Sequence, residues 1–318
     1  MYKIIPLCVF LALLAVSSGQ GEEKTDSLAG RVFRIGFIQS EEEHSPGISW
    51  YESLKNYLLQ EPSVSSVLNK YHIERIALLP TEGYRDMLQR MDMNEFDLAF
   101  CSSVIFVEQK GEYRPILQWR GDIFDSRGQG MTLEKGVIIV GAKSPLFDRH
   151  KQNSKDRKEY IQSRPMAFVS VHNAVGYIYP RLSLWRNCKL WEPGDFIFCR
   201  SSEEVVKYVV SGLVEIGACE KDTFHSALKR YCPDIPEENL ARILMETPPA
   251  PTNPIVIRSS LHPQISELGR AVKGSIKFFY NSSKRPDIPR VVDSRDENFK
   301  NLREEIAEFH KILDMKND

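Results

Sequence analysis

The sequence lacks the motifs that mark most enzyme active sites. It has no G-x-G-x-x-G after a strand, no G-x-x-x-x-G-K-[ST], no H-E-x-x-H, no C-x-x-C and no G-x-S-x-G. Its 7 histidines are scattered without the spacing of metal ligands. We therefore expect no catalytic residue, no metal site and no cofactor.

An excess of charge of either sign is also missing. Lys plus Arg number 42 and Asp plus Glu number 43, which gives a formal net charge of -1. Proteins that bind nucleic acid usually carry a basic face or a run of Lys and Arg, and no such block stands out here. We therefore expect no nucleic-acid partner.

Only one long apolar run occurs, from Ile4 to Val16 near the N-terminus. It follows Lys3 and precedes small residues, which is the order of a secretory signal peptide, and it is too short for a comfortable membrane span. We expect residues 1–19 to be a signal peptide and the mature protein to be periplasmic or secreted, without a lipid. A membrane-anchoring or buried helix is the alternative.

Cysteine is sparse, with 6 residues in the chain. Cys8 lies in the apolar run, and the others are odd in number, so at least one stays unpaired even in an oxidising compartment. Cys188 and Cys199 flank a loop with the turn-like sequence E-P-G-D. A disulfide across this loop is an open alternative, because spacing alone does not fix the distance between the two residues.

From Arg31 onward the chain alternates short apolar strands with amphipathic helical patterns. This alternation predicts an α/β fold with mainly parallel strands, and 318 residues are enough for two compact lobes. The expected strands are Val32–Ile38, Ile73–Pro80, Phe96–Ser103, Tyr113–Trp119, Gly136–Leu146, Met166–Ser170, Glu215–Glu220 and two within Arg242–Arg258. The Pro-rich middle of the last segment is expected to be an extended connector.

One strand-to-helix turn, which we call the elbow, has the geometry of an anion site. The segment Ser170–Trp185 reads SVHNAVGYIYPRLSLW, where a strand ends and apolar residues then recur at helical spacing. The first N–H groups of such a helix lack partners and the helix dipole adds partial positive charge, so oxyanions bind there. Pro180 in a helix must relieve its clash with the carbonyl four residues back, which belongs to Gly176, and this indicates that the elbow geometry is kept. A plain turn is the alternative.

The order of these segments resembles the phosphate, phosphite and phosphonate-binding proteins of ABC transporters, which have the type II periplasmic solute-binding fold. The similar motifs are FDLAFCSSVIFVE, GVIIVGAKSPL, PMAFVSVHNAVGYIYPRLSLW, EVVKYVVSGLVEIGACEKDTF and METPPAPTNPIVIRSSL, and they span about Arg31 to Tyr280. The resemblance implies a two-lobed α/β fold with a mixed sheet in each lobe and two crossing strands as a hinge. Lobe 1 is then residues 31–136 and 249–290, lobe 2 is residues 137–248, and residues 291–318 are a C-terminal helix.

The resemblance also implies a set of ligand-binding residues in the cleft between the lobes. These are Tyr84, Ser102, Ser103, Asn173, Ala174, Val175, Gly176, Tyr177, Glu220 and Asp222. Ser102 and Ser103 close a strand whose carboxyl end faces the ligand crevice of an open α/β sheet. Glu220 and Asp222 are open to a second reading as helix caps, and Tyr84 to one as a helix-start aromatic residue that packs on the sheet.

The elbow departs from the family pattern in its side chains. The family usually has a run of Ser and Thr before Gly-Tyr, whereas this chain has Asn173, Ala174 and Val175. Asn173 is expected to offer one amide donor in place of the hydroxyls. Each hydrogen bond to a charged group contributes about 1.5–3 kcal/mol, so two lost hydroxyls would weaken phosphate-type binding by about 10²–10⁴.

These observations favour an exported solute-binding protein that captures a small anionic solute, phosphonate-like or another oxyanion, and delivers it to an ABC transporter permease. We expect a monomer. Two alternatives remain, since a fold does not fix a function. One is an exported bilobed interaction or sensor-partner module with an altered or lost ligand, and the other is an enzyme on the same fold.

Overall fold

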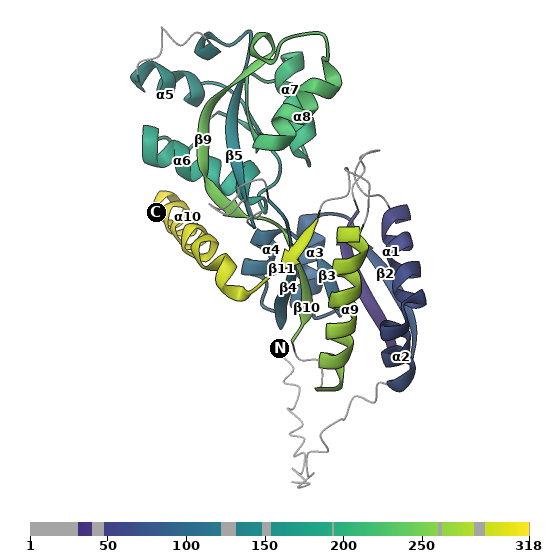
Figure 1. Cartoon of the computed structure of the whole chain (residues 1–318). Coiled ribbons are helices and arrows are strands. Elements are labelled where there is room, and N and C mark those ends of the chain that lie inside the picture. Colours follow the sequence, from purple (N-terminus) through teal and green to yellow (C-terminus); the bar gives the residue numbers. More distant parts are fainter. Residues whose placement is uncertain are drawn as a thin grey trace, which may run out of the picture.

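The computed structural model describes residues 31–39, 48–121, 132–147, 154–192, 194–259, 263–282 and 290–317. Two α/β lobes follow one another along the long axis of the molecule (Figure 1). The expected signal peptide, residues 1–19, lies outside the described residues. No helix in the described part of the chain is both long and apolar enough to cross a bilayer.

Lobe 1 is built on a mixed sheet of six strands. In spatial order the strands are β11 (Val291–Asp293), β4 (Tyr113–Trp119), β10 (Pro254–Arg258), β3 (Leu98–Phe100), β1 (Arg31–Ile38) and β2 (Ile73–Thr81). β3, β1 and β2 are parallel, whereas β10, β4 and β11 join as antiparallel neighbours. β1 and β3 each have a strand on both sides, and most of their side chains are buried, as the apolar sequence predicts.

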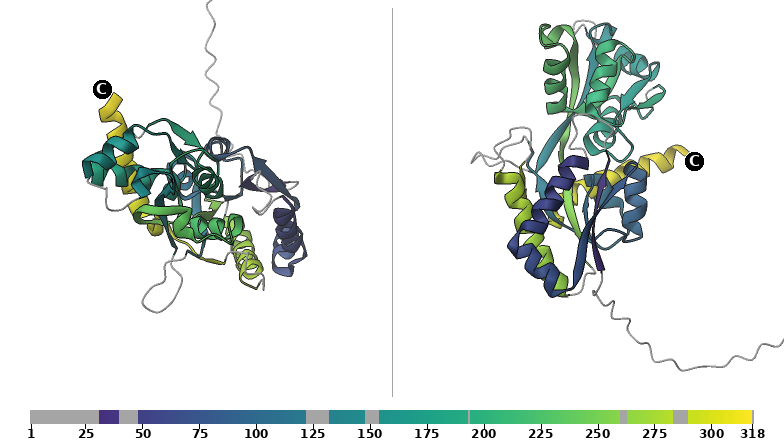
Figure 2. Two further views of the ribbon diagram at one scale, coloured as in Figure 1. Left: turned by 90° about the horizontal axis from the view of Figure 1, so that it is seen from above. Right: turned by 90° about the vertical axis from the view of Figure 1, so that its right-hand side faces the viewer.

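Helices cover both faces of the lobe 1 sheet (Figure 2). One face carries α1 (Ile48–Gln60) and α9 (Pro263–Ser282), with α2 (Pro62–Lys70) packed against both. The other carries α3 (Tyr84–Asp92) and α4 (Ser103–Glu108). α2 was not expected from the sequence. Pro62 occupies its first turn, where a missing N–H costs nothing, and its buried side chains recur at helical spacing.

Lobe 2 is built on a mixed sheet of five strands. Their spatial order is β7 (Phe196–Phe198), β6 (Met166–Phe168), β8 (Ile216–Glu220), β5 (Leu133–Gly141) and β9 (Ala241–Pro251). Its helices are α5 (Ser154–Gln162), α6 (Tyr179–Cys188), α7 (Ser202–Ser211) and α8 (Lys221–Tyr231), with short turns at Pro145–Phe147 and Glu237–Asn239. α7 is capped by the Ser201 side chain and ends at Gly212, whose φ of 77° is left-handed.

The two long strands β5 and β9 pair antiparallel and join the lobes (Figure 1). The Pro-rich stretch expected to be a connector is part of β9 itself, and Pro249 and Pro251 pair with residues of β5. Prolines are tolerated there because β9 is an edge strand whose free side needs no N–H donor. The two-lobed α/β fold with a mixed sheet in each lobe is confirmed, while the lobe limits given above stay a prediction.

A buried glutamine holds the base of the crossing strands. Gln118, on β4, has no exposed surface. Its amide nitrogen donates to the carbonyl oxygens of Thr132 and Thr252, at 3.3 and 2.8 Å, and its oxygen accepts from Ser294 and Asn298, both at 3.1 Å. One side chain therefore links β4, both crossing segments and the segment after β11.

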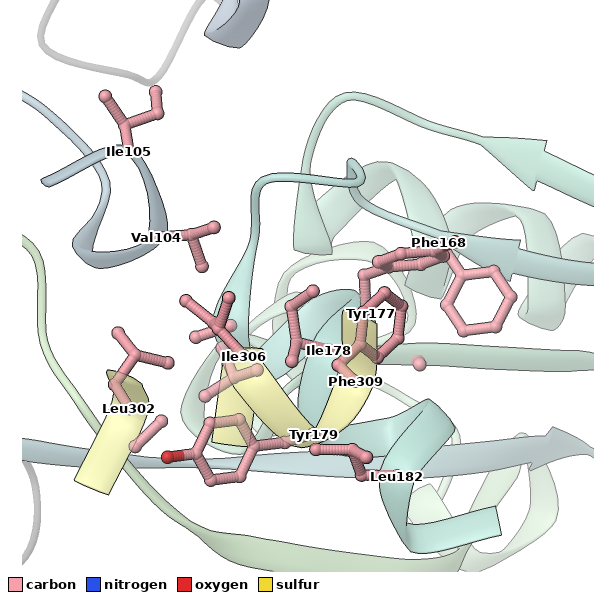
Figure 3. Close-up of a cluster of buried hydrophobic side chains, with 14 of the residues drawn as sticks. Val104, Ile105, Phe168, Tyr177, Ile178, Tyr179, Leu182, Leu302, Ile306 and Phe309 are labelled. Carbon is pink, nitrogen blue, oxygen red and sulfur yellow. The ribbon is translucent and has the colours of Figure 1, made fainter. Parts of the chain in front are cut away.

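The segment 291–318, expected to be one helix, begins with strand β11 and a 3₁₀ turn (Asp296–Phe299), so the helix α10 runs only from Lys300 to Asn317. α10 contacts both lobes (Figure 3). Its buried side chains Leu302, Ile306 and Phe309 lie between those of α4 in lobe 1 and those of the elbow and α6 in lobe 2. Arg186 of α6 also pairs with Glu305 and Glu308 of α10, at 2.7 and 2.6 Å.

Candidate ligand-binding elbow

The elbow is a strand-to-helix turn, as predicted, but its helix opens with a π turn. β6 ends at Phe168, and Ala174–Ile178 form wide i to i+5 hydrogen bonds before α6 continues the helix. Pro180 has no N–H to donate into this helix. The carbonyl of Gly176 instead accepts from the N–H of Val169 at 3.3 Å. The proline therefore frees a carbonyl that ties the helix start back to the strand end.

The N–H groups at the start of this helix differ in their availability. Gly176 donates to the side-chain oxygen of Asn173 at 2.6 Å, so Asn173 acts as a helix cap that presents an acceptor. The expectation that Asn173 offers an amide donor stays a prediction, because this contact uses only its side-chain oxygen. Ala174 and Val175 are buried, and the described residues place no acceptor on their N–H groups. Buried N–H groups without a partner are rare and costly.

Close packing fixes the elbow against its neighbours. A Cβ at Gly176 would collide with the side chain of Val169, and a Cβ at Gly136 of β5 would collide with the carbonyl of Val175. Gly136 also donates its N–H to the hydroxyl of Thr247 on β9, at 3.0 Å. The elbow thus rests directly on both crossing strands, and only a residue without a side chain fits at these two contacts. Sequence reasoning missed Gly136, Thr247 and Val169 as neighbours of the elbow.

The structure brings Ser102 to the elbow from the opposite lobe, whereas Ser103 contacts the loop between β9 and β10. Ser102 caps α4, since its hydroxyl accepts from the N–H of Ile105 at 3.1 Å, and the same hydroxyl donates to the carbonyl of His172 at 2.9 Å. The N–H of Ser103 donates to the side chain of Asn253. Both serines are almost fully buried. Lobe 1 therefore meets the elbow at the carboxyl end of β3, as expected of an open α/β sheet.

The expected tyrosines lie in different surroundings. Tyr177 is buried, and its hydroxyl accepts from Arg181 at 2.6 Å, so its polar end lies in the lobe 2 core rather than beside Ser102. Tyr84 begins α3 and packs half-buried against the hydrophobic core, and it has polar neighbours of its own. The structure thus supports the alternative reading of Tyr84 as a helix-start aromatic residue, and it does not bring Tyr177 to the serines.

Around Arg181 lies an aromatic cluster, which we define as Tyr177, Trp191, Phe196 and Phe309. The guanidinium carbon of Arg181 is 4.2 Å from the Trp191 ring centre, 4.8 Å from that of Phe196, and 5.3 and 5.4 Å from those of Tyr177 and Phe309. Arg181 is 2% exposed and also donates to the carbonyl of Trp191. The cluster stabilises a buried cation by ring faces and neutral acceptors, so it belongs to the lobe 2 core.

The two carboxylates at the end of β8 are placed differently. Glu220 pairs with Gly136 in the sheet register, so it lies one strand from the elbow. Burial raises the pKa of the Glu220 carboxyl, the nearby Asp222 charge raises it further, and a hydrogen bond from Thr223 acts in the opposite direction. Asp222 is exposed in the first turn of α8. Of the two, only Glu220 lies in the sheet beside Gly136, which contacts the elbow.

The cysteines of the described residues are all free, so the Cys188–Cys199 bridge left open above is not formed. Cys101 directly precedes Ser102, and burial raises the pKa of its thiol well above the ordinary range. A thiol in that state is a poor nucleophile. In the described ranges no group of three or more His, Cys, Asp or Glu side chains is arranged to hold a metal ion.

Two lobes joined by paired strands, with an elbow facing the other lobe at the junction, define a periplasmic solute-binding protein of type II. Residues 62–273 match the family described as ABC transporter, phosphonate, periplasmic substrate-binding protein, and the chain belongs to this family. Its members are binding components of ABC transporters, so the family implies a periplasmic location and a small substrate. No curated protein matches this chain in sequence.

Several solved structures are similar in fold. PhnD1 from Prochlorococcus marinus, solved with methylphosphonate, has a TM-score of 0.63 at 17% identity, covering 88% of this chain and 99% of its own. XAC2383 from Xanthomonas citri, solved with chloride, has a TM-score of 0.63 at 16% identity, covering 89% and 99%. A phosphonate-transporter binding component from Pseudomonas aeruginosa has a TM-score of 0.59 at 14% identity, covering 91% and 89%. At such identities the likeness shows the fold alone.

Proposed function

We propose that the protein, exported by its N-terminal segment, binds a small anionic solute between its lobes and delivers it to an ABC transporter permease, without catalysing a reaction. The preference for an anionic solute rests on one observation. The buried N–H groups of Ala174 and Val175 have no acceptor among the described residues. These groups begin a helix whose dipole favours negative charge. The buried, protonated thiol of Cys101 and the lack of catalytic motifs speak against the enzyme alternative.

The ligand is proposed to differ from a simple phosphonate. The elbow has no Ser or Thr hydroxyl at 173–175, and its third N–H, that of Gly176, is already bonded to Asn173. A tetrahedral phosphonate group would therefore find two free N–H groups. Each missing hydrogen bond to a charged group costs about 1.5–3 kcal/mol, or roughly 10- to 150-fold in affinity. The site thus favours an anion that needs few donors, such as a carboxylate or a singly charged oxyanion.

The test is calorimetric titration of the purified mature protein with methylphosphonate, phosphate, phosphite, sulfate and acetate. Wild type should bind methylphosphonate and phosphate weakly. Asn173→Ala removes the internal acceptor and frees the N–H of Gly176, so it should bind these anions roughly 10-fold or more tightly. Ser201→Ala is the matched control, because it removes the cap of α7, where the Ser201 hydroxyl accepts from the main-chain N–H of Glu204 at 3.1 Å. Ser201→Ala should lose a similar amount of helix stability without a change in its affinity for these anions.

The outcome of the titration distinguishes the solute-binding function from the alternatives. Submicromolar binding of methylphosphonate by wild type would show that the missing donors do not matter. If neither wild type nor Asn173→Ala binds any of these anions, the interaction or sensor-partner module is favoured. In that module the Asn173 oxygen has permanently taken the place of a ligand oxygen.

A further inference from the structure

The two lobes share one hydrophobic core, and the C-terminal helix α10 is part of it (Figure 3). Lobe 1 contributes α4, and lobe 2 contributes the elbow and α6. Side chains from all of these elements are at most 5% exposed, namely Val104, Ile105, Ile178, Tyr179, Leu182, Leu302, Ile306 and Phe309. The junction of the lobes therefore excludes water at this place.

α10 is anchored on lobe 1 at its start and on lobe 2 further along. Just before its first turn, Phe299 packs against Phe106 of α4, with ring centres 4.7 Å apart. Later on the helix, the ring of Phe309 packs against those of Tyr177 and Trp191 in lobe 2, at 5.6 and 5.1 Å. The helix thus reaches from one lobe to the other.

Two ion pairs reinforce the contact between α10 and lobe 2. Arg186 of α6 pairs with Glu305 and Glu308 of α10, at 2.7 and 2.6 Å. Its guanidinium donates two hydrogen bonds to each carboxylate. Since these side chains are 20% to 42% exposed, each pair contributes less than a buried contact would.

Moving lobe 2 away from α10 would break all of these contacts. Exposing one large apolar side chain such as Phe309 disfavours a conformation by about 10- to 150-fold. Each partly exposed ion pair adds up to about fivefold. Together these losses make a separated form roughly 10²–10³ times rarer. Domains with small, polar contacts move relative to each other, whereas a large hydrophobic contact holds them together.

We propose that α10 locks the two lobes into one rigid unit, so that the native protein keeps a single arrangement of its lobes with or without a bound anion. The lock goes beyond the proposed function and does not depend on it, because none of its contacts involves the solute.

The test measures the distance between the lobes. Spin labels carried on ketone-bearing amino acids replace Ser66 on α2 and Leu213 beside α7, both exposed, which avoids the native cysteines. Pulsed electron resonance should give one narrow distance distribution for wild type, and methylphosphonate, phosphate or acetate should leave it unchanged. A chain that binds none of these anions in calorimetry still tests the lock, since its lobes are also measured without a ligand.

Replacing Phe309 by Lys should release the lobes. Phe309→Lys removes the buried ring and brings a second cation beside Arg181, whose guanidinium carbon lies 5.4 Å from the Phe309 ring centre. A second, broader distance distribution should appear, because the separated form becomes about 100-fold or more commoner. Phe278→Lys is the matched control, since Phe278 is 63% exposed on α9 and its replacement should keep the wild-type distance.

Circular dichroism shows whether each variant is folded. If Phe309→Lys is not, Phe309→Ala takes its place, since it removes the ring without adding a charge and should still give a second distance. The lock is overturned if wild type shows a second distance, if an anion shifts the wild-type distance, or if the folded Phe309 variant keeps the wild-type distribution.

Discussion

Replacing Gln118 by Met should show how far the hinge depends on one amide. Met has nearly the same length and volume, so the change removes hydrogen bonds and leaves the packing almost unaltered. The carbonyl of Thr132 keeps the N–H of Thr252 at 3.0 Å, and Asn298 keeps the hydroxyl of Thr132 at 3.2 Å. The carbonyl of Thr252 and the hydroxyl of Ser294 have no other partner among the described residues, so both become unsatisfied in a buried place.

The expected loss follows from these two groups. Leaving a buried polar group without a partner costs about 1–3 kcal/mol, so Gln118→Met should lower the free energy of unfolding by about 2–6 kcal/mol. Urea unfolding followed by circular dichroism measures it. Gln109→Met is the control, since the side-chain oxygen of Gln109 is buried and has no partner already, and it should change stability by less than about 1 kcal/mol. Equal losses in the two variants would refute the reasoning.

Two further predictions concern the strands beside the elbow. Gly136→Ala should cost about 1–3 kcal/mol in urea unfolding and weaken anion binding, because its Cβ meets the carbonyl of Val175; Gly274→Ala in α9, where a Cβ meets nothing within 4 Å, should instead stabilise slightly. Burial raises the pKa of Glu220 above its unfolded value, so its favourable contribution is present in acid and is lost as the pH rises through the folded pKa. Glu220→Gln should therefore raise the melting temperature at about pH 7.5 but not at about pH 3.5; equal gains at both would contradict it.

Most of the fold was predictable because strands with a neighbour on each side are buried and read as apolar runs, whether those neighbours are parallel or antiparallel. β1, β3 and β5 all follow this pattern. The end of α7 at Gly212 was also predictable, because glycine readily adopts the left-handed φ found there. α2 was missed because its start depends on Pro62, which ends one helix and begins another. Only the Pro-rich end of β9 was read as a connector, because proline is a poor strand residue unless the strand lies at an edge, and the sequence does not show which strands lie there.

The candidate site was less predictable than the fold. Asn173 was expected to donate, and only the three-dimensional turn shows that its oxygen faces the N–H of Gly176. Tyr177 follows the glycine of the elbow, yet its direction is decided by Arg181, which lies a helical turn later and draws the hydroxyl into the core. Contacts between the lobes, such as that of Glu108 with His172, join residues far apart in the chain, and no local pattern reports them.

Phe309 lies on the last helix, α10, but packs in the core of lobe 2, so lobe 2 needs this helix for its native packing. The sheet of lobe 2 ends with β9 at Pro251, but the aromatic cluster around Arg181 is complete only when α10 arrives and places Phe309 beside Tyr177 and Trp191. During synthesis the ribosome must therefore complete the last part of lobe 1 and α10 before lobe 2 acquires its final core. Contacts of such long sequence separation form late, so a nascent chain that stops short of α10 leaves the buried cation of lobe 2 incompletely enclosed.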